Sequence, residues 1–300
     1  MTTHIKLSLG PVIFYWPRET LFNFYAEIAN LPIDCIYLGE TVCSKRRSLN
    51  LDDWLDLAVI LTKAGKQVVL STLSLLEAES ELLTLRRICS NGQFLVEAND
   101  FGAIQLLSSQ KIPFVAGSTV NIYNTQALKL LASKGLSRWV FPVELSRANL
   151  AVMQQQRPTG VETEVLAYGH LPLAFSARCF TARSHNLPKD DCRLCCADYP
   201  EGRLLTTRDN SPFLTLNGIQ TLSSRPINLL AELPDFINLG VEWLRISPQF
   251  THTVDIINVF ADCIAGNIDP HAATVELEKF APLGVVSGYW HGKPGMERLI

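Results

Sequence analysis

Residues 34–71 have the sequence DCIYLGETVCSKRRSLNLDDWLDLAVILTKAGKQVVLS, which is the clearest indication of the fold in this chain. Two apolar runs, 34–39 and 67–71, flank a polar loop and the amphipathic segment 50–66. Asn50 can cap the start of a helix in this segment, and Gly65 can end it. Short, nearly continuous apolar runs on either side of a helix are typical of parallel strands that are buried on both faces. The stretch therefore predicts one strand–helix–strand unit.

The same alternation of apolar runs and helix-compatible segments extends over the whole chain. Eight strands that alternate with helices predict the α/β class and a (β/α)₈, TIM-barrel-like fold. We expect a single barrel domain, residues 1–300, with a cysteine-rich loop, 176–212, inserted after the seventh strand. The predicted strands are residues 7–15, 34–39, 67–71, 93–97, 113–117, 138–143, 164–168 and 243–246.

One segment has two interpretations. Residues 213–222 alternate between apolar and polar side chains, with Asn217-Gly218 near the centre. Asn-Gly between two alternating runs favours a β-hairpin. The alternative is a single strand that leads into a helix at 227–239, and the pattern does not separate the two.

The composition limits the class of protein. The chain has 300 residues, of which 47% are hydrophobic and 18% charged, and its net charge is −3. This apolar fraction excludes a disordered chain, and the slightly acidic balance argues against broad binding to nucleic acid or anionic lipid. No apolar run approaches the ~18 residues of a transmembrane helix, and the N-terminus has no signal-peptide pattern. We therefore expect a cytoplasmic protein without a transmembrane segment.

The cysteines indicate a metal site. Cys179, Cys192, Cys195 and Cys196 lie within eighteen residues, in a loop-like segment. Clustered thiols in a reducing compartment favour zinc or an iron–sulfur cluster over disulfides. Structural zinc usually has two close pairs of ligands and only one is present here, whereas an iron–sulfur cluster often recruits a distant cysteine, so the spacing leaves the metal open. Three other cysteines lie in apolar segments and are expected to be buried and inert: Cys35, Cys89 and Cys263.

Polar residues directly follow several of the predicted strands. In a parallel barrel they would ring the C-terminal mouth, where barrel enzymes carry their active sites. Cys43 lies just beyond the second strand and Cys179 opens the segment after the seventh, so both are expected on this face. His170 is the candidate for proton transfer because its ordinary pKa is near neutrality, and a structural histidine is the alternative. Glu40 is expected to act as a base or to pair with a nearby arginine.

Four blocks of sequence resemble the collagenase-like (peptidase U-type) family, in the branch that acts in ubiquinone biosynthesis. They are 37–47 (YLGETVCSKRR), 142–146 (PVELS), 168–183 (YGHLPLAFSARCFTAR) and 244–249 (LRISPQ). The resemblance covers most of the chain, from Gly10 to about His291. It implies a 4Fe-4S cluster whose ligands correspond to Cys43, Cys179, Cys192 and Cys196. It selects Cys196, whereas a C-x₂-C spacing favours Cys195.

The same resemblance implies a role in oxygen-independent ubiquinone biosynthesis. The chain would be one subunit of an anaerobic hydroxylase, in a heterodimer with a UbiU-like sister protein, and would act on the ring of a ubiquinone precursor. Two alternatives stay open: an RNA hydroxylation factor of the same family, which the acidic charge disfavours, and a zinc-stabilised, non-catalytic scaffold. No nucleophile–base arrangement typical of a protease is visible in the sequence.

Basic residues flank the cysteines, and their role has three interpretations. They would stabilise an anionic cluster, hold a carboxylate substrate by bidentate contacts, or form a solvated basic rim. These residues are Lys45, Arg46, Arg47, Arg178, Arg183 and Arg193.

Overall fold

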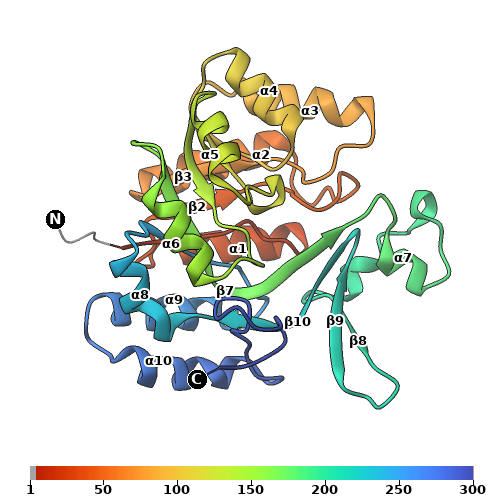
Figure 1. The fold of residues 1–300 in the computed structure, drawn as a ribbon. Coiled ribbons are helices and arrows are strands. Elements are labelled where there is room, and N and C mark those ends of the chain that lie inside the picture. Colours follow the sequence, from red (N-terminus) through yellow and green to blue (C-terminus); the bar gives the residue numbers. More distant parts are fainter. Residues whose placement is uncertain (1–4, 300) are drawn as a thin grey trace.

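Eight strands form a closed parallel barrel, as the alternating pattern predicts. The computed structural model describes residues 5–299 and places each barrel strand beside the next one along the chain. The eighth, β11, pairs in parallel with both β7 and β1, which closes the sheet (Figure 1). The prediction of a (β/α)₈ barrel is confirmed. The barrel strands are β1 (Lys6–Leu9), β2 (Cys35–Leu38), β3 (Gln67–Ser71), β4 (Leu95–Ala98), β5 (Phe114–Ala116), β6 (Leu136–Val140), β7 (Glu162–Phe175) and β11 (Trp243–Ile246).

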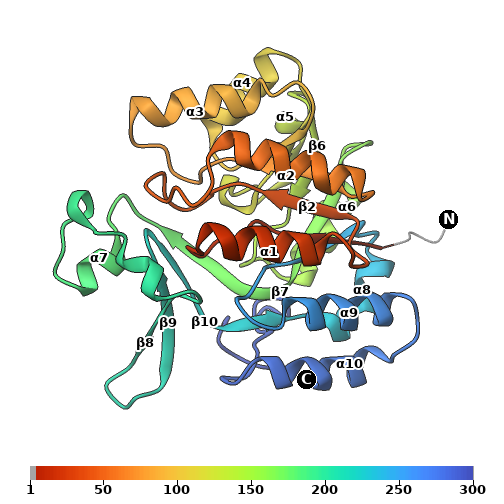
Figure 2. The same cartoon turned by 180° about the vertical axis from the view of Figure 1, so that it is seen from behind.

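Helices cover the outside of the barrel, and Figure 2 shows α1, α2 and α9 along one side of it. The predicted helix after the second strand is α2, in which Asn50 accepts a hydrogen bond from the Asp53 amide at 3.0 Å. None of the helices in the described part of the chain is long and apolar enough to cross a membrane. The helices are α1 (Arg18–Ile28), α2 (Leu51–Lys63), α3 (Glu79–Cys89), α4 (Phe101–Ser109), α5 (Thr125–Ala132), α6 (Arg147–Gln155), α7 (Phe180–Ser184), α8 (Leu233–Asn238), α9 (Thr253–Ile264) and α10 (Pro270–Leu277).

The seventh strand extends far beyond the barrel. Its outer half pairs with β10 (Gln220–Asn228), which pairs in turn with β9 (Pro212–Asn217) and β8 (Arg203–Thr206), all antiparallel. This antiparallel extension projects to one side of the barrel (Figure 1). Of the two interpretations of 213–222, the β-hairpin is therefore the one observed, as β9–β10. The single-strand alternative is wrong. A helix does follow, but β10 continues to Asn228 and α8 begins only at Leu233.

Several boundaries differ from the predictions. The first strand was predicted at 7–15 but ends at Leu9, and the sixth, predicted at 138–143, runs from Leu136 to Val140. The seventh strand was predicted at 164–168 but runs from Glu162 to Phe175, because β10 supplies hydrogen-bond partners that the local sequence does not reveal. His170 consequently lies within β7, not after a strand. The segment 176–212, predicted as a loop, contains α7 and β8 and enters β9. The single-domain prediction for 1–300 stays a prediction, and its terminal residues, 1–4 and 300, lie outside the described part.

The barrel interior contains a buried charged network. Arg245 donates from Nε to Glu164 and from Nη1 to Glu97, both at 2.8 Å, and Arg138 lies 3.8 Å from Glu164. Tyr37 also donates to Glu164. Burial alone would raise the pKa of Glu164, but the charges of Arg245 and Arg138 outweigh it and hold this pKa below the ordinary value. Oppositely charged residues thus fill part of the barrel below its mouth, and the Arg245–Glu97 pair joins two strands, β11 and β4, that are not neighbours in the sheet.

Candidate functional site

The loop that carries Cys43 is shaped by Glu40. Glu40 follows β2 and accepts hydrogen bonds from the backbone amides of Val42 at 2.8 Å and Cys43 at 3.0 Å. Its carboxylate also lies 3.8 Å from Arg46, and burial raises its pKa above the ordinary value. These contacts position the Cys43 loop, and the pairing of Glu40 with an arginine was one of its two predicted roles. A role as a base stays a prediction.

Arg46 connects this loop to the antiparallel extension. Its buried guanidinium donates from Nη1 to the Ile13 carbonyl at 2.7 Å and from Nη2 to the side chain of Asn217 at 2.6 Å. A Cβ on Gly218 would lie only 2.9 Å from Nη2. The tip of the β9–β10 hairpin therefore sits directly against Arg46, which explains the need for glycine there, at a φ of 64°.

The same hairpin tip holds the segment that begins at Cys179. The Phe180 amide donates to the Gly218 carbonyl at 2.8 Å, and the Gly218 amide donates to the Thr181 hydroxyl at 2.9 Å. Cys179 caps α7, with its sulfur accepting a hydrogen bond from the Ala182 amide at 3.4 Å. Gly218 thus links the Cys179 segment to the Cys43 loop through Arg46.

Cys192, Cys195 and Cys196 lie on a loop with a strained backbone. Arg193 and Leu194 both have a φ of 51°, in the left-handed region that side chains disfavour. The loop is closed by a hydrogen bond of 3.1 Å from the Cys195 amide to the Cys192 carbonyl. Each such residue costs about 1–3 kcal/mol, and strain of this kind concentrates at functional sites.

Five half-buried thiols interact at this end of the barrel. Burial raises the pKa of Cys43, and the neighbouring Cys196 raises it further; the pKa of Cys179 is raised in the same way by burial, by Cys43 and by Cys192. Burial also raises the pKa of Cys196, while the charge and a hydrogen bond of Arg46 act to lower it. The predicted placement of Cys43 and the inserted cysteines on one face is therefore observed. Burial and the neighbouring Cys179, Cys196 and Cys192 also raise the pKa of Cys195.

Free sulfur donors of this kind suit a soft metal or an iron–sulfur cluster. The Arg46 Nε is a buried donor without a partner, which fits an anionic group near the thiols. Within residues 5–299, no group of three or more His, Cys, Asp or Glu side chains has the geometry to hold a metal ion. The sulfur donors therefore suit the predicted cluster in chemistry but are not arranged around a common metal position, and the assignment of Cys43, Cys179, Cys192 and Cys196 stays a prediction. As expected, Cys35, Cys89 and Cys263 are buried.

His170 lies in a second location. Its Nδ1 is 2.7 Å from the Ser223 carbonyl, and burial lowers its pKa below the ordinary value. It lines a cavity of about 70 Å³ at the barrel mouth, together with Asn99, Arg245 and Ser247. This mouth cavity shares no lining residue with the larger cavity beside Cys43. The structure therefore does not bring His170 and Glu40 into one cavity, and proton transfer by His170 stays a prediction.

A family comparison identifies the group of proteins to which the chain is related. A family model described as peptidase family U32 matches residues 22–299. The chain belongs to this family. The match covers the barrel strands from β2 onward, all the cysteines and the antiparallel extension.

Solved structures similar to this U32-family chain are also barrels, but they share little sequence with it. Dihydropteroate synthase from Stenotrophomonas maltophilia is 10% identical, with a TM-score of 0.43, over 88% of this chain and 92% of the other. DAHP synthase from Thermotoga maritima is 10% identical, with a TM-score of 0.46, over 95% of this chain and 72% of the other. The spore coat polysaccharide biosynthesis protein SpsE from Bacillus subtilis is 9% identical, with a TM-score of 0.44, over 98% and 75%. Likenesses this remote carry no argument about function.

Several residues that organise the site were not singled out from the sequence. Asn217 was noted only as a turn residue, yet its side chain holds Arg46. Glu164 and Arg245 are charged residues inside short apolar strands, which was the available signal for a buried polar network. Of the basic residues predicted near the cysteines, Arg46 alone is fully buried, whereas Arg47, Arg178 and Arg193 are not.

Proposed function

We propose that this U32-family chain is a UbiV-type iron–sulfur protein that acts in oxygen-independent ubiquinone biosynthesis. It holds a 4Fe-4S cluster on Cys43, Cys179, Cys192 and Cys196 and works with a UbiU-like partner in hydroxylation of the ring of a ubiquinone precursor. The observation that carries the proposal is the convergence of Cys43 with the inserted cysteines around one buried arginine. These four cysteines correspond to the cluster ligands of the ubiquinone branch of the family, which this sequence resembles.

The residues of the chain have distinct roles in this proposal. Glu40 fixes the Cys43 loop, and the hairpin tip at Gly218 fixes the Cys179 segment. Arg46 offsets the negative charge that four thiolates bring to one place. A cluster bound there supplies one-electron chemistry or activates a substrate. A partner subunit would complete the covering of the site, because the inserted cysteines are only partly buried.

Anaerobic reconstitution tests the proposal. The protein should bind about four iron and four sulfide per chain, as a 4Fe-4S cluster requires, and should show broad visible absorption. Replacing Cys43 and Cys179 by serine together should abolish this absorption, whereas a Cys89→Ser, Cys263→Ser double variant should keep it. A colourless wild-type protein with stoichiometric zinc would favour the scaffold function instead and would contradict the cluster.

A further inference from the structure

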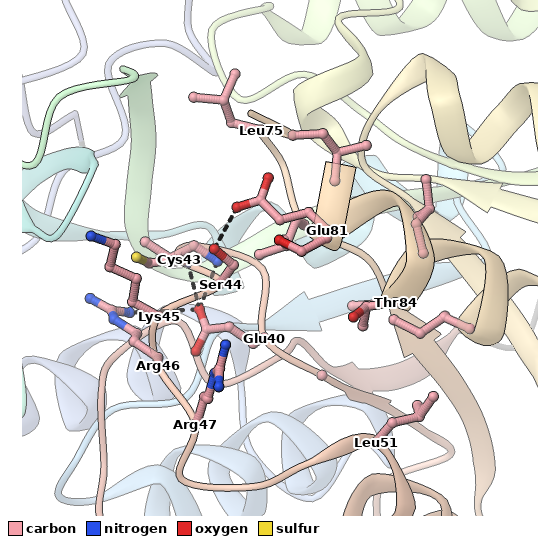
Figure 3. A pocket seen from close by; sticks show the side chains of 18 of the residues that line it. Glu40, Cys43, Ser44, Lys45, Arg46, Arg47, Leu51, Leu75, Glu81 and Thr84 are labelled. Atoms are coloured by element: carbon pink, nitrogen blue, oxygen red, sulfur yellow. Dashed lines mark hydrogen bonds and ion pairs between the residues drawn. The ribbon is translucent and has the colours of Figure 1, made fainter. Parts of the chain in front are cut away.

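A cavity of about 660 Å³ lies outside the barrel, between α2 and α3 and beside the Cys43 loop. This volume is within the ~300–1,000 Å³ range of small-molecule sites. Figure 3 shows Cys43, Lys45 and Arg46 along one side of the cavity and Thr84 on the opposite side. Leu75 and Leu51 lie far apart at its upper and lower ends in this view. The cavity therefore extends from a predicted cluster ligand into the gap between two helices.

The walls away from Cys43 carry most of the apolar side chains of the cavity, beside the exposed Thr84 and Arg87. The apolar side chains include Leu51 and Trp54 from α2, Leu85 and Ile88 from α3, and Leu73 and Leu75 from the loop between β3 and α3. Leucines are unusual in a surface loop, because connecting segments run over the surface and are mostly polar. Leu51, Leu73 and Leu75 are half-buried, and none of them is among the side chains that pack on the hydrophobic core of the described residues. These leucines are available to an apolar ligand.

The polar side of the cavity carries charges of both signs. Lys45 pairs with Asp190 at 3.3 Å and Lys189 pairs with Glu77. The Ser44 hydroxyl donates to Glu81 at 2.5 Å. Most charges along this side are paired, but Arg47, which also lines the cavity, makes no ion pair within the described residues. The polar side therefore offers one guanidinium to a head group that accepts hydrogen bonds. The cavity suits a molecule with a small polar head and an apolar chain.

We infer that this cavity binds the isoprenoid chain of a prenylated phenol, with the ring directed toward Cys43. The inference rests on the proposed function, which makes a ubiquinone precursor the substrate. The apolar walls take the chain, and the side that carries Ser44 and Cys43 takes the hydroxyl-bearing ring. Each buried methylene group should tighten binding about fourfold, so the chain supplies most of the affinity.

Calorimetry with the full-length protein tests the inference, with 2-geranylphenol as the probe and phenol as the reference. Geranylphenol should bind at least tenfold more tightly than phenol. Leu75→Gln, which places an amide in the apolar wall, should weaken geranylphenol binding at least tenfold. Leu83→Gln is the matched control, because Leu83 is 57% exposed on α3 and does not line the cavity. It should bind as the wild type does.

Thr84→Trp provides a second variant. Thr84 is an exposed helix residue that faces the cavity (Figure 3), so a larger side chain there should obstruct the cavity and weaken binding.

Equal affinity for phenol and geranylphenol, or unchanged affinity in both cavity variants, would overturn the inference. Equally tight binding of n-decanol would overturn the assignment to a prenylated phenol. Calorimetry needs no iron, so the two proposals can fail separately. A protein that binds geranylphenol but no cluster would refute only the proposed function. A protein that binds iron but not geranylphenol refutes the cavity assignment alone.

Discussion

Arg46 shows how one side chain organises a site made from distant segments. Its two terminal nitrogens reach Ile13 and Asn217, and its charge acts on Cys196. A planar guanidinium makes such divergent contacts, which a lysine ammonium cannot reproduce. The positive charge also stabilises thiolates, the form in which cysteine binds metals. The residue thus serves both the local structure and the proposed cluster.

The neighbouring cysteines Cys195 and Cys196 should differ in their importance for iron binding. Cys196 interacts with Cys43 and Arg46, whereas Cys195 interacts chiefly with the other inserted cysteines and is less buried. We expect Cys196→Ser to lose most of the iron after anaerobic reconstitution and Cys195→Ser to retain it. Iron and sulfide analysis measures both. Loss of the iron from Cys195→Ser alone would show that the fourth ligand is Cys195.

Gly218, at the tip of the β9–β10 hairpin, should be sensitive to substitution. Ala at position 218 has to adopt a φ of 64° and places its Cβ 2.9 Å from Arg46. Gly160→Ala is the matched control, because Gly160 has a φ of +84° and open space around it. Both variants should lose about 1–2 kcal/mol of stability from the left-handed backbone, and Gly218→Ala about 1–3 kcal/mol more from crowding. Urea unfolding measures the difference, and equal losses would show that the tip does not position Arg46.

The barrel strands give a prediction about pH. Glu164 is fully buried with its pKa below the ordinary value of 4.5, so its contribution to stability is present above the unfolded-state pKa and is lost as the pH falls through the folded pKa. Glu164→Gln should cost about 3–5 kcal/mol at pH 7, since it leaves buried arginine charge unpaired. The difference in free energy of unfolding between the variant and the wild type should become smaller below about pH 4.5.

The control for this change is Glu162→Gln. Glu162 pairs with Arg138 at 3.0 Å, but its side chain is 36% exposed. Exposed pairs contribute about 0–1 kcal/mol, so this variant should be nearly as stable as the wild type. Urea unfolding at pH 7 and at pH 4 separates the two glutamates. A Glu164→Gln protein as stable as Glu162→Gln would mean that the interior network is not electrostatically important.

Local pattern predicted the barrel strands well because parallel strands buried on both faces are apolar along their whole length. The Asn217-Gly218 signal favoured a hairpin without deciding it, and the observed turn lies one residue later, at Gly218-Ile219, with Asn217 paired to Gln220. Local pattern did not predict the outer half of β7, since that half is stabilised by β10, which lies some fifty residues later in the chain. The pairing of Glu97 with Arg245 was equally inaccessible, because 148 residues separate them. Contacts between distant segments decide the site, and these require the fold.

The low net charge of the whole molecule and its projecting antiparallel extension both affect how the protein associates with other chains. A net charge of −3 gives little repulsion between copies, and the antiparallel extension projects from the barrel with Leu204 and Phe213 exposed. Large exposed apolar side chains on a projecting element are consistent with a surface that a partner covers. An obligate interface should bury on the order of 2,000 Å² or more. We expect the chain alone to self-associate and to form a one-to-one heterodimer when it is co-expressed with a UbiU-like sister protein.

The partnership makes a prediction that can be checked in cells. If ring hydroxylation needs both barrels, deletion of either gene should stop ubiquinone synthesis without oxygen and leave it intact with oxygen, because oxygen-dependent hydroxylases then supply the ring oxygens. Quinone extracted from the deletion strain under both conditions provides the measurement, and a strain complemented with the wild-type gene is the control. Complementation with the Cys43→Ser, Cys179→Ser variant should fail only under anaerobic conditions. Normal anaerobic ubiquinone in the deletion strain would refute the functional proposal. A fully active monomer would instead refute the heterodimer and leave the cluster proposal standing.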